Sequence, residues 1–360
     1  RLPKARFTGM GGTRMQEAGV DTLFGIERMG AVGIVEVLDD FDHYYKVYRT
    51  LMREIASRRY DAVILIDYPT LNLRLAKQSK RFDCPVFYFI SPQVWAWRKG
   101  RIRDIRDSVN KMFVILPFEE KMYLDAGVDA EFLGHPFVDL VHPSRTREES
   151  REKYSLNSAI KTIGLVPGSR MNEVNSLLDV MIQAAQKIHS ELGSCQFLLP
   201  VADSIDPDMV RQRLGTNPLG IQLIEGEPYD VMNSCDMLII ASGSATLEAG
   251  ILGCPMVIIY KLNPLTYILA KLLVNAPLVG LVNIVAEEEV VPELIQGKVT
   301  AENICTEVLA VLQAPEKEKA VRERLLKIKS TLGDPEVMKV VAKRIADVMD
   351  KLSANEKTPI

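Results

Sequence analysis

Eight short apolar runs recur along the 360-residue chain, and each is continuous instead of alternating with polar residues. They cover residues 61–67, 85–90, 111–116, 162–167, 195–200, 221–225, 236–241 and 255–260. Continuous apolar runs of this length are typical of strands in parallel sheets, which are buried on both faces. Amphipathic helical patterns lie between several of them, for example at 41–55. This alternation predicts an α/β fold with two Rossmann-like, doubly wound domains.

A polar and charged stretch at 142–161 separates the apolar runs into two groups. With 47% hydrophobic residues, a chain of this length can bury two cores. We therefore expect one domain over residues 1–145 and a second over residues 146–334. Residues 335–352 form an amphipathic helical pattern, and this helix is a candidate to pack back on the first domain.

Composition excludes several classes of protein. The net charge of −3 argues against a generally basic nucleic-acid binder. The five cysteines are scattered without a C-x-x-C pair, and the four histidines lack metal-binding spacing, so we expect neither disulfides nor a metal site. Charged and proline residues interrupt the apolar stretch at 264–282, which argues against a membrane-spanning helix.

The segment "LVPGSRMNEV" (165–174) passes from an apolar strand through a corner into a helical pattern. Gly168 and Ser169 are ordinary turn residues, and an exposed arginine at a helix start needs no function. Alternatively, backbone N–H groups and the guanidinium of Arg170 converge there on a phosphate. This segment alone leaves both interpretations open.

A second corner follows the strand at 236–241 and consists of Ser242, Gly243 and Ser244, with Glu248 one turn further on. A helix start favours a diphosphate, and a carboxylate one turn into the helix can accept hydrogen bonds from two ribose hydroxyls. A serine cap followed by a helix-forming glutamate is the simpler alternative. Because both corners follow strands in the same predicted domain, we favour a nucleotide site.

Two features of the first predicted domain indicate a lipid surface. Residues 29–41 carry a dense apolar cluster that includes Val35 and Leu38. Trp95 stands near a group of basic residues that begins at Arg98. Aromatic and basic residues together suit peripheral binding to an anionic membrane. They could also bind nucleic acid, but the acidic remainder of the chain argues against that partner.

Several motifs resemble those of lipid-A-disaccharide synthase, in order and over nearly the whole chain. They are "DYPTLN" (67–72), "SPQVWAWRKGR" (91–101), "LPFE" (116–119), "FLGHP" (132–136), "VPGSRMNEV" (166–174), "ASGSATLEAGILGCPMVIIYK" (241–261) and "LVNIVAEEEVVPEL" (281–294). The resemblance implies an inverting glycosyltransferase with the GT-B fold. It would transfer 2,3-diacylglucosamine from UDP to the 6-hydroxyl of 2,3-diacylglucosamine 1-phosphate, forming the β-1,6 lipid A disaccharide 1-phosphate and UDP.

The resemblance also implies the setting of the reaction. The substrates would be UDP-diacylglucosamine and diacylglucosamine 1-phosphate, with no cofactor and no metal. The protein would act in the cytoplasm, bound peripherally to the inner face of the inner membrane, and a homodimer is compatible with the sequence. Family members usually open with a strand and a Gly-Glu-x-Ser-Gly-Asp loop, whereas this sequence begins at Arg1 without them. We therefore expect the N-terminal strand of the first domain to be missing.

The resemblance assigns roles to individual residues. From spacing alone, Asp67 is equally a turn carboxylate or a general base at the end of a strand. The resemblance favours the catalytic base. From the two corners, we expect Arg170 to meet the diphosphate and to stabilise the charge on departing UDP. The resemblance places Asn72, Gln93 and Arg98 beside the acceptor. It places Glu173 and Asn283 beside the nucleotide.

Two other functions remain open from the sequence. A UDP-sugar 2-epimerase shares the same scaffold and would act without an acceptor. A non-catalytic module that binds UDP-sugar or lipid is the second alternative. His135 and the acidic run at 39–42 carry potentially reactive side chains, but we interpret them as a structural histidine and a helix cap.

Overall fold

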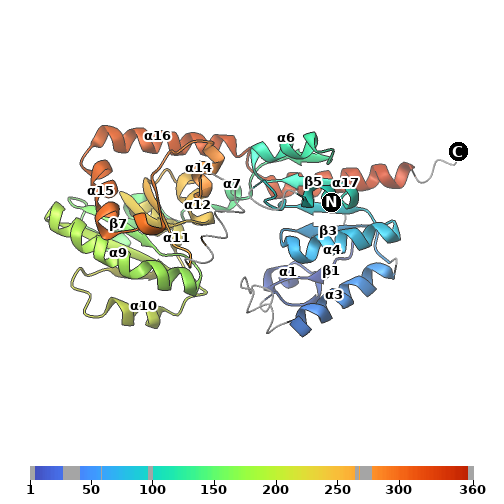
Figure 1. Ribbon diagram of the computed structural model, residues 1–360, viewed down its shortest axis with the longest axis horizontal. Helices are drawn as coiled ribbons and strands as arrows, with labels where there is room; N and C mark the ends of the chain where they lie inside the picture. Colours follow the sequence, from blue (N-terminus) through green and yellow to red (C-terminus); the bar gives the residue numbers. More distant parts are fainter. Residues whose placement is uncertain are drawn as a thin grey trace. The chain divides into compact units, whose positions relative to one another are not determined.

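The computed structural model describes residues 5–26, 41–57, 59–95, 100–263, 267 and 278–355. The chain forms two compact units, whose elements are labelled in Figure 1. The first unit combines residues 1–133 with residues 336–360, and the second comprises residues 134–335. Each unit is built on parallel strands and has its own buried core.

The change of unit comes earlier than the charged stretch at 142–161, where the sequence analysis placed it. That stretch is anchored on the second unit. The backbone N–H of Arg145 donates to Asp230 Oδ1 over 3.0 Å, and Arg147 Nη2 lies 2.7 Å from Asp236 Oδ1. The charged composition therefore reflects ion pairs within the second unit instead of a solvated linker.

The second unit contains a six-stranded sheet in which every neighbouring pair is parallel. Its strands are β7 (Lys161–Val166), β8 (Cys195–Val201), β9 (Gln222–Glu225), β10 (Met237–Ala241), β11 (Met256–Tyr260) and β12 (Glu293–Ile295). Their spatial order is β12-β11-β10-β7-β8-β9. The chain thus builds one half outward from β7 and then returns to build the other half outward from β10. This order has a switch point between β7 and β10.

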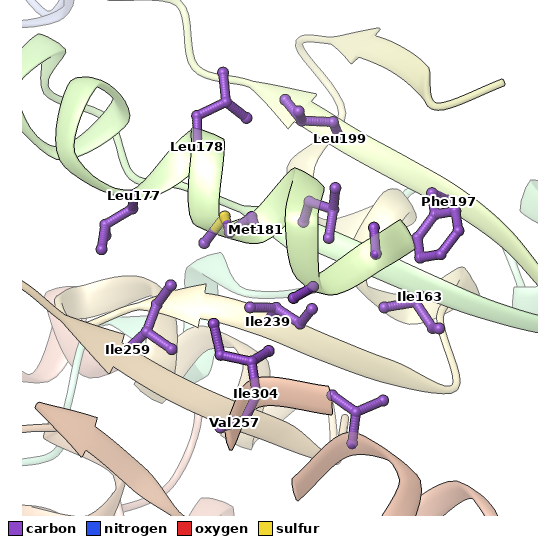
Figure 2. Close-up of a cluster of buried hydrophobic side chains, with 14 of the residues drawn as sticks. Ile163, Leu177, Leu178, Met181, Phe197, Leu199, Ile239, Val257, Ile259 and Ile304 are labelled. Atoms are coloured by element: carbon purple, nitrogen blue, oxygen red, sulfur yellow. The ribbon is translucent and has the colours of Figure 1, made fainter. Parts of the chain in front are cut away.

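The core of the second unit lies between this sheet and helix α9 (Met171–Leu192). Figure 2 shows Leu177, Leu178 and Met181 on the helix above Ile239 of the sheet, with Phe197 further to the right. Leu177, Leu178 and Met181 recur at helical spacing on one face of α9 and are almost completely buried. Each large apolar side chain that is buried in this way contributes about 1.5–3 kcal/mol.

Shorter helices complete the second unit. They are α7 (Phe137–Leu140), α8 (Arg147–Lys153), α10 (Pro207–Leu214), α11 (Pro228–Ser234), α12 (Ser244–Ile251), α14 (Leu281–Ala286), α15 (Ala301–Leu312) and α16 (Pro315–Thr331), with the 3₁₀ turn η2 (Gln296–Lys298). Several begin with proline at the first helical positions, where its missing N–H costs nothing.

The first unit contains two parallel sheets. A small sheet pairs β1 (Thr8–Met10) with β2 (Asp21–Phe24). The larger sheet has the order β3-β4-β5-β6, with strands β3 (Val63–Ile66), β4 (Val86–Phe89), β5 (Lys111–Val114) and β6 (Ala130–Phe132). The helices are α1 (Thr13–Glu17), α3 (Phe41–Ala56), α4 (Pro69–Ser79), α5 (Arg101–Ser108) and α6 (Pro117–Asp125), with the 3₁₀ turn η1 (Lys80–Phe82).

Helix α17 (Val337–Asn355) belongs to the first unit although it ends the described chain. Its Val337, Val341 and Ile345 are buried against Phe87 and Phe113 of strands β4 and β5. Within the described residues, no helix is long and apolar enough to cross a membrane.

All eight strands predicted from continuous apolar runs are present, which confirms the α/β prediction. The expectation that each is buried on both faces is wrong for β3, where Ile64 and Ile66 are 40% and 48% exposed. These two side chains point to the same face of β3, which is an edge strand of its sheet. Four strands, β1, β2, β6 and β12, were not predicted; each has only three or four residues.

His135 is buried near the start of the second unit. Its backbone N–H donates to the carbonyl of Leu332 over 2.8 Å, and its Nδ1 accepts the N–H of Phe137 over 3.0 Å. Nδ1 therefore carries no proton in this arrangement. Burial lowers the pKa of His135 to about 4. The geometry assigns this histidine a structural role within the second unit.

We predict that His135 makes the protein acid-sensitive. In the unfolded chain histidine titrates near pH 6.5, whereas the folded protein keeps it neutral down to about pH 4. The unfolded state thus binds more protons in this window, so stability falls by up to about 3 kcal/mol as pH drops from 6.5 to 4. His135→Asn retains an acceptor for Phe137 and should flatten this part of a melting-temperature profile. The same change at exposed His142 should leave the profile unaltered; an equal effect of both variants would contradict the assignment.

Candidate functional site

Two corners of the chain lie at the same edge of the six-stranded sheet. β7 and β10 are parallel neighbours, with Ile163 opposite Met237 and Val166 opposite Ile240. Their carboxyl ends therefore stop at the same level. The Gly168–Arg170 corner follows β7, and the Ser242–Ser244 corner follows β10. This is the switch point of the sheet, where doubly wound folds bind ligands.

The first corner depends on a glycine. Gly168 has φ +114°, a conformation that residues with a side chain rarely adopt. A Cβ atom at this position would stand 2.2 Å from Glu173 Oε2. The same oxygen accepts the backbone N–H groups of Ser169 and Arg170 over 3.1 and 3.3 Å. Arg170 Nη1 donates to Glu173 Oε1 over 2.9 Å. Glu173 thus caps the start of α9 and aligns the guanidinium.

The hydrogen bonds at the first corner differ from those predicted for a phosphate site. The Glu173 carboxylate already occupies the two backbone donors that the sequence analysis offered to a phosphate. The side chain of Arg170, 64% exposed, remains accessible beyond the ion pair. The guanidinium, with five N–H donors, can hold Glu173 and a second anion together. The positive group that this corner presents to a ligand is therefore Arg170.

The second corner has a different construction. The Ser242 hydroxyl donates to the carbonyl of Val279 over 2.9 Å, so it holds a neighbouring loop. Gly243 and Ser244 are exposed at the start of α12, whose first N–H groups lack acceptors within the helix. Burial raises the pKa of Glu248, and a hydrogen bond from Ser244 opposes this shift. A half-buried carboxylate thus stands one turn behind an exposed helix start.

Asn283 is directed at the polypeptide around it. It is completely buried, and its Oδ1 accepts the N–H groups of Val290 and Val291 over 3.0 and 3.1 Å. Its Nδ2 donates to the carbonyl of Val291 and to Glu293 Oε1 over 2.8 and 2.9 Å. The sequence analysis placed this amide on the nucleotide, but its hydrogen bonds hold the polypeptide around it.

Glu293, which was not predicted, continues this network. Its Oε2 and Oε1 accept the N–H groups of Val279 and Gly280, each over 2.8 Å. Since Ser242 donates to the carbonyl of Val279, Glu293 links strand β12 to the second corner. Asn283 and Glu293 therefore support the corner from behind.

Two tyrosines complete this edge and were also missed. Tyr260 is the last residue of β11. Burial and then the charge of Glu173 raise the pKa of Tyr260, while the charge of Arg170 lowers it. Tyr260 therefore lies beside the first corner. Burial and then Glu248 raise the pKa of Tyr229, which lies beside the second corner. The position of Tyr260 at the end of a predicted strand could have identified it. Tyr229 is the second residue of α11 and gives no comparable signal.

In the first unit, Asp67 stands at the carboxyl end of β3 in a strained turn. Asp67 and Tyr68 have φ values of +47° and +42°, left-handed conformations that cost about 1–3 kcal/mol each in non-glycine residues. The carbonyl of Asp67 accepts the Tyr88 hydroxyl and Asn72 Nδ2 over 2.6 and 2.7 Å. Its N–H donates to the carbonyl of Phe89 over 2.9 Å. Neighbouring elements therefore hold this turn in place.

The carboxyl group of Asp67 is suited to proton transfer. The protein around it displaces water and raises its pKa, and a hydrogen bond from the backbone of Tyr68 lowers it in part. Asp67 as a whole remains exposed. A carboxylate that is accessible and more basic than usual is a stronger proton acceptor near neutral pH.

The remaining predicted acceptor residues differ in their placement. Asn72 is buried, and its amide donates to the carbonyls of Ile66 and Asp67, so it supports the turn instead of flanking a ligand. Gln93 is exposed after β4, and Trp95 Nε1 donates to Glu119 Oε1 over 3.1 Å. The predicted lipid and acceptor residues Val35, Leu38 and Arg98 lie outside the described residues. Within the described part of the chain, no three metal-binding side chains cluster together.

Solved structures share this fold. The UDP-GlcNAc 2-epimerase from Neisseria meningitidis bound to UDP-GlcNAc aligns with a TM-score of 0.61 at 11% identity, covering 95% of this chain and all (100%) of that one. The calicheamicin glycosyltransferase CalG4 aligns with a TM-score of 0.55 at 14% identity, covering 98% and 92%. These likenesses confirm the predicted GT-B fold.

Sequence comparison identifies the family. The lipid-A-disaccharide synthase from Syntrophus aciditrophicus (strain SB) is 43% identical over 336 residues, which cover 93% of this chain and 88% of the relative. The family model described as lipid-A-disaccharide synthetase matches residues 1–344. With the motifs that carry the resemblance spread over both units, the chain belongs to the lipid-A-disaccharide synthase family, glycosyltransferases of lipid A biosynthesis.

Proposed function

We propose that this protein transfers 2,3-diacylglucosamine from UDP to the 6-hydroxyl of 2,3-diacylglucosamine 1-phosphate. The observation that carries the proposal is the pair of corners at the switch point of the second unit, Gly168–Arg170 and Ser242–Ser244. An arginine from one strand end and a helix start from the next suit a diphosphate, and Glu248 suits the ribose. We assign the second unit to UDP-sugar and the first to the acceptor.

Asp67 is the proposed general base. An inverting transfer needs one group that takes the proton from the attacking hydroxyl as the new glycosidic bond forms. The raised pKa of Asp67 and its firmly held turn support this role. Positioning matters because a general base acts only within hydrogen-bond distance of the proton that it removes.

Arg170 is the proposed stabiliser of the leaving group. Negative charge grows on the diphosphate as the bond to the sugar breaks, so a fixed guanidinium interacts more strongly with the transition state than with the substrate. The ion pair with Glu173 supports a fixed orientation. In this proposal Arg170 and the start of α12 meet the diphosphate charge without a divalent metal.

Product analysis tests the proposed reaction. We expect the protein to convert UDP-diacylglucosamine and diacylglucosamine 1-phosphate into the disaccharide 1-phosphate and UDP, in EDTA as well as in Mg²⁺, as followed by mass spectrometry. A requirement for added metal would contradict the charge assignment. Turnover of UDP-sugar to a 2-epimer without acceptor would instead indicate an epimerase.

Substitutions at Arg170 and Asp67 should both reduce turnover. Removing one fixed charge-stabilising group commonly costs about 10²–10³ in kcat, which we expect for Arg170→Ala. Arg170→Lys should recover activity only in part, because an ammonium group cannot make the planar two-pronged contact. Asp67→Ala should lower kcat by about 10²–10⁴. Near-normal kcat in either variant would remove that residue from the mechanism.

Peripheral binding to an anionic membrane is a further part of the proposal. Phe7, Ile26 and Tyr45 of the first unit are large side chains about half exposed, and Ile26 and Tyr45 flank the apolar 29–41 stretch in sequence. Apolar insertion together with basic residues gives salt-sensitive binding. We expect the protein to float with phosphatidylglycerol-containing liposomes at low salt and to dissociate at high salt. Failure to float at low salt would contradict this assignment.

A further inference from the structure

Glu119 is a buried carboxyl group that the mechanism above does not use. It lies in the first turn of α6, directly after β5, and is 1% exposed. Among the described residues, no cation forms a salt bridge with it. Burying a carboxylate without a cationic partner is costly, so its hydrogen-bond donors must account for its presence.

The groups around Glu119 are mainly donors. Trp95 Nε1 donates to Oε1 over 3.1 Å, and the N–H of Leu116 donates to Oε2 over 3.2 Å. The Ser91 hydroxyl is buried beside Glu119 and Tyr123 without a hydrogen bond of acceptable geometry to either. Burial raises the pKa of Glu119 to about 7, and these donors oppose the shift.

Two of these partners belong to the segment 91–95, which follows β4. The hydroxyl of Tyr123, also on α6, donates to the carbonyl of Pro92 over 2.8 Å and holds the middle of the segment. Glu119 holds its end through Trp95, whose ring also meets Phe118 edge-on at 5.4 Å between ring centres. Helix α6 thus fixes the segment at two points.

The segment 91–95 begins beside the proposed base. β4 pairs with β3, and the carbonyl of Phe89 at the end of β4 accepts the N–H of Asp67. Tyr88 of the same strand donates to the carbonyl of Asp67. Gln93, which the family resemblance places beside the acceptor, is exposed on this segment. The segment thus continues directly from the strand end that holds the turn at Asp67.

We propose that Glu119 is a positioning residue for the acceptor, and that its carboxylate, through the indole of Trp95, holds the 91–95 segment beside Asp67. This inference rests on the proposed function. An ionised Glu119 accepts both donors in charge-assisted bonds, which are stronger than bonds between neutral groups. Protonation removes the charge from both bonds and replaces one of the two acceptors with a donor, so it weakens the hold on the segment.

The neighbouring groups do not titrate in the same range. Tyr123 shares the helix with Glu119, and burial raises its pKa far above neutrality; the same holds for Tyr88 of β4. Ser91 and Trp95, which face Glu119 from the segment, do not ionise near pH 7. A change near pH 7 in the surroundings of Trp95 therefore reports on Glu119.

Tryptophan fluorescence tests the contact without any substrate. The chain has two tryptophans, Trp95 and Trp97, so a Trp97→Phe background isolates Trp95. We expect its emission to titrate with a midpoint near pH 7 and Glu119→Gln to abolish this transition. The matched control is Glu120→Gln on the same helix, which removes a carboxylate charge, keeps an oxygen acceptor for the Phe132 N–H and should keep the transition. A transition that survives Glu119→Gln would overturn the proposal.

Acceptor kinetics test the consequence. We expect Glu119→Gln to raise the KM for diacylglucosamine 1-phosphate by about 10-fold or more, with the KM for UDP-sugar unchanged. Trp95→Phe removes the same bond from the other side and should give a similar effect, and the double variant should be no worse than either. If Glu119→Gln does not fold, the acceptor KM of Trp95→Phe tests the positioning role by itself.

The outcomes separate the two claims. A wild-type protein that shows the fluorescence transition but forms no disaccharide would overturn the proposed function and leave the Glu119–Trp95 contact intact. Additive losses in the double variant, or an equal rise in both KM values, would overturn the positioning role while the glycosyltransferase activity stands.

Discussion

The order of strands in the second unit is the constraint on which the nucleotide site depends. Because the chain builds outward from β7 and then outward from β10, the connections after these neighbouring strands leave the sheet in opposite directions. Two helix starts are therefore brought to one edge with space between them. The buried face of α9 and the network behind Ser242 fix the two corners, so the site is as rigid as the core that supports it.

The first unit uses hydrogen bonds to hold a strained turn. Asp67 and Tyr68 adopt left-handed conformations that the chain would not choose alone, and Asn72 and Tyr88 fix the carbonyl of Asp67. Glu119 supports the adjoining segment through Trp95 in a comparable way. In both units, buried polar side chains such as Asn72 and Asn283 form hydrogen bonds with the backbone. Asp67 and Arg170 are exposed and remain available for substrate.

The sequence predicted the fold better than it predicted the roles of single side chains. Continuous apolar runs identified eight strands, because burial on two faces favours such runs; β1, β6 and β12 are three residues long and leave no such run. Spacing placed Arg170 and Ser242 at strand ends, which strand order then made neighbours. Spacing could not show whether the Asn72 and Asn283 amides face a ligand or the backbone, since that depends on contacts between distant segments.

The central claim is that the corners after β7 and β10 hold the diphosphate and the ribose of one nucleotide. Calorimetric titration of UDP and of uridine into Arg170→Ala and Glu248→Gln tests it most directly. Arg170→Ala should weaken UDP binding and leave uridine binding unchanged, because only UDP carries the diphosphate. Glu248→Gln should weaken both ligands, because both carry the ribose. Equal weakening of UDP and uridine by Arg170→Ala, or no effect of either substitution, would contradict the account.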